Sequence, residues 1–190
     1  MPEERTPRFS YCPKCGDKLH LGHDQDFPRL TCISCAFILY ENPAVGVAAI
    51  VMNEHQHILL GRRRGGKYSD LWCIPCGYLE YHEDVYQGVK REFKEETNLD
   101  IELQRIFTVQ SNFHDPDCHS VGIWFLAHIY GGEMQAGDDL KEVAYFALDD
   151  IPPLAFPTDQ VVIDMLTVVH QGELLESTQP TGIKDGGPNR

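Results

Sequence analysis

Residues 77–99, which read G-Y-L-E-Y-H-E-D-V-Y-Q-G-V-K-R-E-F-K-E-E-T-N-L, decide how this chain is organised. The C-terminal two thirds of the stretch predict a helix, because good helix formers dominate it and no proline interrupts it. Apolar side chains recur there at spacings of three and four residues and should share one helix face. These residues are Val85, Tyr86, Val89 and Phe93.

The predicted helix also carries a cluster of acidic residues. Glu92, Glu95 and Glu96 fall at i, i+3 and i+4, so their carboxylates lie together on an arc that borders the apolar face. Like charges at this spacing repel by about a few tenths of a kcal/mol per pair. Two readings are open: an acidic surface that faces water, or a site for a cation, for which all-oxygen ligands favour Mg²⁺ or Mn²⁺.

The whole stretch resembles the Nudix box, G-x5-E-x7-R-E-U-x-E-E-x-G-U, in which U is aliphatic or aromatic. The residues that fill its positions at the right spacing are Gly77, Glu83, Arg91, Glu92, Phe93, Glu95, Glu96 and Leu99. The one departure is Asn98, where the family has glycine. This position follows the predicted helix end, where a left-handed residue is wanted, and asparagine is the best substitute for glycine there.

The resemblance covers residues 43–170 and implies both a fold and a set of roles. The fold it implies is the Nudix α/β/α sandwich, of the mixed α/β class, with a mixed sheet between helices. The residues implied to bind two or three catalytic Mg²⁺ or Mn²⁺ ions are Glu92, Glu95, Glu96 and, through its backbone carbonyl, Gly77. Arg91 and Glu83 match the pair that holds the metal-binding carboxylates in place.

The reaction implied is hydrolysis of a diphosphate linkage. Metal ions neutralise the negative charge that repels an attacking hydroxide, and they lower the pKa of bound water. The family's general base is either a box glutamate or an acid in a downstream loop. Downstream candidates are Glu142, Asp139 and Asp138, of which Glu142 best matches the usual position. His114, His119 and His128 are interpreted as packing or surface residues.

Four of the seven cysteines form two further short motifs, Cys12-x2-Cys15 and Cys32-x2-Cys35. This spacing fits tetrahedral thiolate coordination and resembles a zinc ribbon, and a site closed by four thiolates predicts one structural Zn²⁺. Gly16 and Ala36 follow the two motifs, where the chain must turn tightly past the metal. By contrast, Cys73-x2-Cys76 has no second pair to complete a site, and both cysteines are interpreted as packing residues.

Composition narrows the class of protein. A chain of 190 residues, 42% apolar and 24% charged, predicts a soluble globular protein, and an odd number of cysteines argues against a disulfide framework. Neither a signal peptide nor a membrane-spanning run is recognisable, so a cytoplasmic protein without a membrane partner is expected. The net charge of −13 and the near-neutral ribbon argue against binding to nucleic acid. A homodimer is expected by analogy alone.

The chain is divided by the sequence into a zinc ribbon at 1–42, a Nudix domain at 43–176 and a disordered tail at 177–190. The predicted strands are 44–52 and 57–61, which should form a hairpin, and 101–110, 120–130 and 142–148. A helix is predicted over 159–170, with Thr158 as its N-cap. A glycine-containing loop holds Arg62, Arg63 and Arg64, which either face water or contact substrate phosphates.

The substrate is predicted less sharply than the reaction. A zinc ribbon before a Nudix domain resembles NADH pyrophosphatases, but their downstream S-Q-P-W-P-F-P motif is absent, and residues 110–120 read Q-S-N-F-H-D-P-D-C-H-S. The segments G-Y-L-E at 77–80 and F-A-L-D-D-I-P-P-L-A-F at 146–156 look most like those of plant-type FAD and ADP-ribose pyrophosphatases. A dinucleotide or nucleotide-sugar substrate is therefore expected, ADP-ribose or FAD before NADH, cleaved to AMP and a second monophosphate. The rival hypothesis is a non-catalytic nucleotide-sensing regulator whose ribbon binds DNA or protein.

Overall fold

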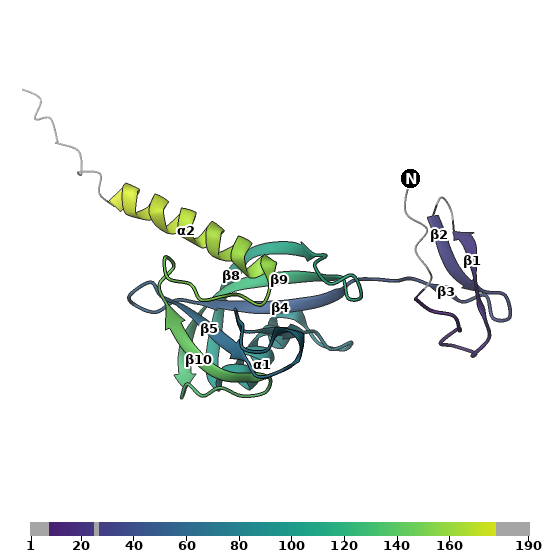
Figure 1. Ribbon diagram of the computed structural model, residues 1–190, viewed down its shortest axis with the longest axis horizontal. Helices are drawn as coiled ribbons and strands as arrows, with labels where there is room; N and C mark the ends of the chain where they lie inside the picture. Colours follow the sequence, from purple (N-terminus) through teal and green to yellow (C-terminus); the bar gives the residue numbers. More distant parts are fainter. Residues whose placement is uncertain (1–7, 25–26, 178–190) are drawn as a thin grey trace, which may run out of the picture. The chain divides into compact units, whose positions relative to one another are not determined.

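The computed structural model describes residues 8–24 and 27–177 (Figure 1). Backbone contacts divide the chain into Met1–Asn42, here unit 1, and Pro43–Arg190, here unit 2. No helix within the described ranges is long and apolar enough to cross a membrane. The predicted disordered tail falls outside these ranges beyond Ser177.

Unit 1 is a small antiparallel sheet with the order β1-β2-β3. Its strands are β1 (Leu19–Asp24), β2 (Phe27–Cys32) and β3 (Ile38–Leu39). Gly16 and Ala36 have positive φ angles of 81° and 56°, so both chain reversals lie where the sequence predicts them, directly after Cys15 and Cys35. Among the described side chains of unit 1, the buried apolar ones are Cys12, Leu30 and Cys32. An apolar core this small cannot stabilise the unit alone.

The described part of unit 2, residues 43–177, contains two sheets and two long helices. The four-stranded sheet has the order β7-β4-β9-β8, and the three-stranded sheet has the order β10-β5-β6. The elements in chain order are β4 (Ala44–Val51), β5 (Ile58–Arg63), the 3₁₀ turn η1 (Gly66–Tyr68), β6 (Trp72–Cys73), β7 (Cys76–Tyr78), α1 (Val85–Thr97), β8 (Leu99–Asn112), β9 (Ser120–Gly132), β10 (Leu140–Phe146) and α2 (Pro157–Ser177).

Strand β4 lies inside the four-stranded sheet, and its two faces contact two cores of unit 2. It pairs in parallel with β9 and antiparallel with β7, so the sheet is mixed. Val47, Ala49 and Val51 belong to the core beneath α1. The alternate residues Ala48 and Ile50 belong to the core that includes α2. Burial on both faces explains the continuous apolar run of β4, and the sheet between two helices confirms the predicted α/β/α sandwich.

The predicted hairpin between the first two strands of unit 2 is wrong. Strands β4 and β5 lie in different sheets and share only the isolated bridge Met52–Ile58. Strand β5 pairs instead with β10 and β6. Ile58, Leu59 and Leu60 are completely buried, so neither face of β5 is free for water, and the strand is placed by long-range partners.

Several element boundaries also differ from the prediction. Strand β8 extends beyond the predicted strand at both ends, and β9 extends beyond it at the C-terminal end. The pairing of β8 with β9 contains bulges near Asp100, Leu103 and Ile106. Strand β10 begins and ends two residues earlier than the predicted strand, and Glu142 lies within it and not in a loop. Helix α2 begins at Pro157, which makes Thr158 a helical residue rather than the N-cap. Proline suits a first helical position because its missing N–H has no intrahelical partner there.

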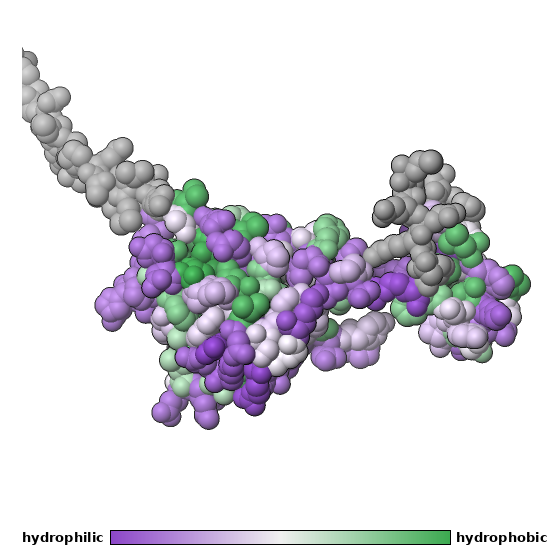
Figure 2. All heavy atoms as spheres, viewed as in Figure 1, coloured by the Kyte–Doolittle hydropathy of each residue, from purple (hydrophilic) through white to green (hydrophobic). Residues whose placement is uncertain are grey.

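Helix α2 has apolar residues on two sides. Val162, Ile163 and Leu166 are buried in the core, whereas an outward row remains exposed, made of Val161, Met165, Val168 and Val169. Figure 2 shows hydrophobic side chains gathered on the surface where the first part of this helix lies. The predicted helical periodicity is therefore correct, but it does not by itself identify the buried face.

Candidate metal sites

Helix α1 begins and ends at residues that its sequence specifies. The Asp84 side chain accepts hydrogen bonds from the N–H groups of Tyr86 and Gln87, which satisfies two free donors of the first turn. At the other end Asn98 is left-handed, with φ of 59°, as the sequence predicts. Its side-chain Nδ2 donates to the carbonyl of Glu133 at 2.9 Å, a contact that glycine could not make.

The buried face of α1 is narrower than predicted. Val89 and Phe93 are almost fully buried beneath the sheet, and Val85 packs against the same core. Tyr86 is 50% exposed and reaches the core only through an edge-to-face contact with Phe125, at 5.5 Å between ring centres. The prediction that Tyr86 belongs to the buried face is therefore only partly correct.

Arg91 organises the acidic residues around α1. Its Nε and Nη2 donate to the two oxygens of Glu83 at 2.6 and 2.7 Å. Its Nη1 donates to Glu92 Oε1 at 2.8 Å and to Glu95 Oε2 at 2.9 Å. The hydrogen bonds from Arg91 lower the pKa of Glu83 to about 2. One guanidinium therefore joins the segment before the helix to two carboxylates on the helix.

Gly77 and Glu92 are in direct contact. A Cβ atom built at Gly77 would lie 2.0 Å from Glu92 Oε2, which is closer than non-bonded atoms approach. Only glycine therefore allows this carboxylate to lie against β7. The contact places a carboxylate beside the Gly77 backbone, and hard cations such as Mg²⁺ take just these oxygen donors. The residues present therefore fit a divalent cation.

Glu96 is the buried member of the cluster, at 1% exposure. Its Oε2 accepts the N–H of Cys76 at 2.7 Å. Burial raises the pKa of Glu96 well above its usual range, and burial also raises the pKa of Glu92 despite the opposing effect of Arg91. Glu95, with its side chain 50% exposed, is the accessible member.

The three glutamates are not gathered as tightly as the cysteines. Within the described ranges, the four cysteines alone form a group of at least three such ligands whose atoms all lie within 4.8 Å of one another. Arg91 lies between Glu92 and Glu95, and Glu96 is turned toward Cys76. These contacts account for the separation of the carboxylates.

The downstream acids have different surroundings. Glu142, predicted as a general base, pairs with Arg62 across β5 and β10, with Oε2 at 3.3 Å from Nη1. Asp139 interacts with Glu96 side chain to side chain and accepts from Arg63 Nη2 at 2.5 Å. Asp139, rather than Glu142, therefore lies directly against a box glutamate.

All three arginines of the basic segment are bound by β10 or by the residues that precede it. Arg62 pairs with Glu142, Arg63 pairs with Asp139, and Arg64 Nη2 donates to the carbonyl of Leu140 at 2.9 Å. Arg62 and Arg63 also lie within β5 and not in a loop as predicted. These partners could not be recognised in the sequence, because they depend on the pairing of strands far apart in the chain.

The remaining predicted residues are placed as follows. The thiol of Cys73 is fully buried and lies 3.7 Å from the carbonyl oxygen of Gly61. The pKa of the Cys76 thiol is raised by its hydrogen bond with Cys73 and by burial. Both surroundings fit packing residues. His114 packs against the rings of Tyr68 and Phe156. His119 packs against Phe113, and His128 is exposed on β9.

The four cysteines of unit 1 have the geometry of a tetrahedral thiolate site. The Sγ atoms of Cys12 and Cys35 are 3.7 Å apart, and those of Cys15 and Cys32 are 3.5 Å apart. A tetrahedron with Zn–S bonds of about 2.3 Å has S–S edges of about 3.8 Å. The spacing fits a zinc ion without rearrangement of the chain.

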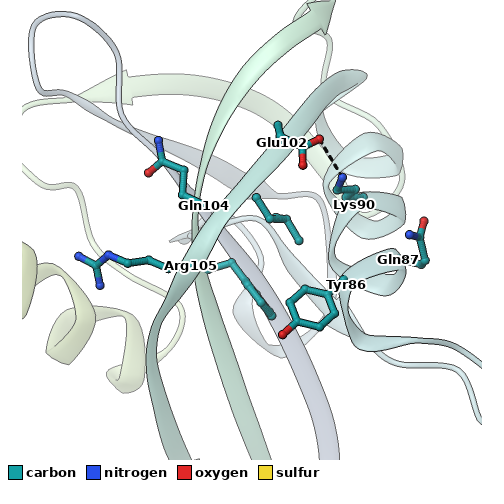
Figure 3. A pocket seen from close by; sticks show the side chains of 8 residues that line it. Tyr86, Gln87, Lys90, Glu102, Gln104 and Arg105 are labelled. Carbon is teal, nitrogen blue, oxygen red and sulfur yellow. Dashed lines mark hydrogen bonds and ion pairs between the residues drawn. The ribbon is translucent and has the colours of Figure 1, made fainter.

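A small cavity of about 190 Å³ lies on a different side of α1 (Figure 3). Its helical lining residues are Tyr86, Gln87 and Lys90, which lie away from the acidic arc, and Lys90 Nζ pairs with Glu102 at 3.1 Å. Arg105 points away from Tyr86 in this view. The cavity therefore does not belong to the acidic site.

Comparison with known proteins agrees with the box geometry. A family model described as NUDIX domain matches residues 42–166. The ADP-ribose pyrophosphatase of Methanocaldococcus jannaschii is 36% identical over 129 residues, 67% of this chain and 76% of that protein. The NAD-capped RNA hydrolase NudC of Vibrio vulnificus is 33% identical over 162 residues, 82% of this chain. The chain spans only 57% of the length of that NudC.

A solved structure supports the same assignment. The crystal structure of a NUDIX hydrolase from Nitrosomonas europaea has a TM-score of 0.76 and 29% identity, and the match covers 86% of this chain and 94% of that one. The likeness thus extends beyond the box to the order of strands and helices around it. Since the family model also covers nearly all of the sandwich, the chain belongs to the Nudix hydrolase family.

Proposed function

We propose that this protein hydrolyses the diphosphate bond of ADP-ribose or of an NAD-like dinucleotide, releasing AMP and a second monophosphate. The observation that carries the proposal is the Arg91 network, in which one side chain orients Glu83, Glu92 and Glu95 around the helix. The substrate class is supported by the names of the archaeal pyrophosphatase and the bacterial NudC. FAD, expected from the sequence, stays a further candidate.

Nudix enzymes use divalent metals, and we propose two or three Mg²⁺ or Mn²⁺ ions here. When bound, these ions would neutralise diphosphate charge and lower the pKa of water. Glu92, Glu95, Glu96 and the Gly77 carbonyl would hold them. Arg91 and Glu83 would keep the carboxylates in position.

Further residues around this site have proposed roles. Glu142 is the proposed general base, with Asp138 and Asp139 as alternatives. Arg62 and Arg64 are the proposed phosphate contacts. The side chain of Arg62 is 38% exposed, so a substrate could reach it without rearrangement of β5.

For unit 1 we propose one structural Zn²⁺ held by Cys12, Cys15, Cys32 and Cys35. The spacing of the four Sγ atoms supports this assignment. We further propose that 1–42 and 43–176 act as the ribbon and the catalytic domain, and that the protein is a homodimer. Metal analysis of the purified chain tests the zinc ion, and light scattering tests the homodimer.

The experiment that tests the function is a substrate screen with Mg²⁺ and Mn²⁺. Purified protein is incubated with ADP-ribose, NADH, FAD and NAD-capped RNA, and AMP or decapped RNA is measured. Glu95→Gln and Glu96→Gln should lower turnover by about 100-fold or more, because each removes a negative charge from the cation site. Glu102→Gln is the matched control, since Glu102 pairs with Lys90 on the other side of the helix.

Two results would contradict the proposal. If no AMP is released from any of these substrates, the proposed substrate class is wrong. If turnover is unchanged in both variants, Glu95 and Glu96 do not belong to the cation site. The regulator hypothesis makes a different prediction, namely binding of ADP-ribose without turnover together with a salt-dependent shift of DNA in a gel. Cleavage of NAD-capped RNA in preference to NADH would overturn the expectation that nucleic acid is not a partner.

A further inference from the structure

Arg63 lies at the end of β5 with its side chain only 19% exposed. Its Nη2 donates to Asp139 Oδ2 at 2.5 Å, and its guanidinium lies 5.5 Å from the centre of the Phe156 ring. Its Nε is buried and has no hydrogen-bond partner among the described residues. The charge of Arg63 is therefore directed into the protein rather than toward solvent.

Asp139 connects this buried cation to the acidic site. Its side chain contacts that of Glu96, which is itself 1% exposed and bound through Oε2 to the N–H of Cys76. The Oδ1 atom of Asp139 is buried without a hydrogen-bond partner in the described structure. Two ionised carboxylates in contact repel each other, and the guanidinium of Arg63 offsets the charge of Asp139 in this pair.

The backbone fixes Asp139 between β5 and α1. The N–H of Arg64 donates to the carbonyl of Asp139 at 2.7 Å, and the N–H of Gly137 donates to the carbonyl of Glu96 at 2.9 Å. A Cβ atom at Gly137 would lie 2.3 Å from the carbonyl oxygen of Glu95, so this segment approaches the helix as closely as glycine permits. The contact between Asp139 and Glu96 is thus built into the fold on both sides.

We propose that Arg63 is a positioning residue, which acts through Asp139 to hold the Glu96 carboxylate toward the cation site, and is not a phosphate ligand. The inference rests on the proposed cation-dependent function. The charge of Arg63 offsets that of Asp139, and this lets Glu96 remain beside Asp139 without turning away. A phosphate would have to displace Asp139 from Arg63 to bind there.

The test is a titration of Mn²⁺ in the absence of substrate, followed by electron paramagnetic resonance. Arg63→Gln leaves Asp139 and Glu96 in unrelieved contact and should weaken Mn²⁺ binding tenfold or more. At saturating Mn²⁺ its KM should stay within twofold of the original. Arg105→Gln is the control, because it removes the same charge from an exposed position on β8.

A double variant tests the route through Asp139. Adding Asp139→Asn to Arg63→Gln removes both charges at once, so Mn²⁺ affinity should return to within threefold of the original protein. Failure of this rescue overturns the proposal. Normal Mn²⁺ affinity in Arg63→Gln together with a KM raised tenfold also overturns it, because that result makes Arg63 a substrate ligand.

Near-ultraviolet circular dichroism establishes whether each variant is folded. If Arg63→Gln does not fold, Arg63→Lys, which keeps the charge, distinguishes a positioning role of Arg63 from a substrate-binding role. Mn²⁺ affinity and KM both close to the original support positioning, and a raised KM at normal affinity contradicts it. Because Mn²⁺ binding is measured without substrate, a protein that binds the ion but cleaves nothing in the screen disproves the proposed function alone.

Discussion

At the scale of single residues, the close approach of the Glu92 carboxylate to Gly77 leaves no room for a side chain at position 77 while the carboxylate keeps its place. Gly77→Ala would place a methyl group on the Glu92 carboxylate, so either that carboxylate or β7 must move. We predict that Mn²⁺ binding weakens about 10- to 100-fold, the range found when groups that support metal ligands are altered. Isothermal titration with Mn²⁺ measures the change.

Gly131→Ala is the control for this substitution. A Cβ atom at Gly131 would first meet Asp100 Oδ2, at 3.4 Å, and that side chain can move. Both variants add the same methyl group to a strand of the same sheet. Equal Mn²⁺ affinity in the two would show that Glu92 does not bind the ion where the box places it.

The acidic residues, Arg91 and Gly77 could all be named from the sequence, because the box has a fixed spacing along one helix and its lead-in. The partners of Arg62, Arg63 and Arg64 could not. Each of these arginines is bound by residues 139–142, and nothing in the local sequence shows that β5 and β10 are neighbours. Local periodicity carries no information on which distant strand becomes the partner.

At the scale of elements, the end of α1 depends on a left-handed residue. Asn98→Ala and Asn98→Gly both lose the hydrogen bond to Glu133, so their difference isolates the backbone strain at φ of 59°. We predict that the alanine variant is less stable than the glycine variant by about 1 kcal/mol. Urea unfolding of the two variants measures the difference, and an alanine variant of equal or greater stability would contradict it.

The start of α2 contains a buried carboxyl group. Asp159 is 1% exposed, its Oδ2 accepts the N–H of Ile74 at 3.0 Å, and burial raises its pKa to about 7. Its pKa in the unfolded chain is about 3.9. Between about pH 4 and pH 7 the folded protein therefore keeps a proton that the unfolded chain has released, so the Asp159 contribution to stability falls as pH rises through this window and is constant above it.

Asp159→Asn should remove this dependence. We predict that the free energy of unfolding of the variant, relative to the original protein, rises from pH 4 to pH 7 and then levels off. Urea unfolding at pH 5, 6, 7 and 8 measures the difference, in which the contributions of other groups cancel. Asp164→Asn, an exposed position on the same helix, is the control and should follow the original protein. A difference independent of pH would show that Asp159 is ionised in the folded protein.

Elements that are specified by their own residues were predicted better than elements that depend on distant partners. α1 and β4 are specified by their own residues, through capping, periodicity and an apolar run. The hairpin was wrong because the turn at 53–56 reverses the chain locally without joining β4 to β5 beyond one bridge. The buried face of α2 was ambiguous because apolar residues lie on two of its sides.

At the scale of the whole molecule, unit 1 depends on its four cysteines. Cys12 and Cys32 are two of the three buried apolar residues among its described side chains, so a metal bound by the cysteines would hold its segments together. We predict that Cys32→Ser in the full chain loses zinc and exposes the amides of unit 1 to rapid hydrogen exchange, while the amides of unit 2 stay protected. Zinc release and exchange mass spectrometry measure these effects.

Cys118→Ser is the control, because Cys118 is exposed and lies in unit 2. It should retain one zinc ion per chain. Full protection of unit 1 in Cys32→Ser would mean that its fold does not need the fourth thiolate. Loss of protection in unit 2 would mean that the two units are not independent.

The parallel pairing of β4 with β9 also determines the order in which the protein can form during synthesis. β4 is made early, but its parallel neighbour follows only after α1 and β8, and Asp139 comes later still. The emerging chain therefore holds a finished box helix, with Val89 and Phe93 uncovered, before the sheet that buries them is complete. Long-range pairing of this kind folds slowly and leaves apolar surface open to aggregation. The acidic site can close only when the chain through Asp139 has left the ribosome.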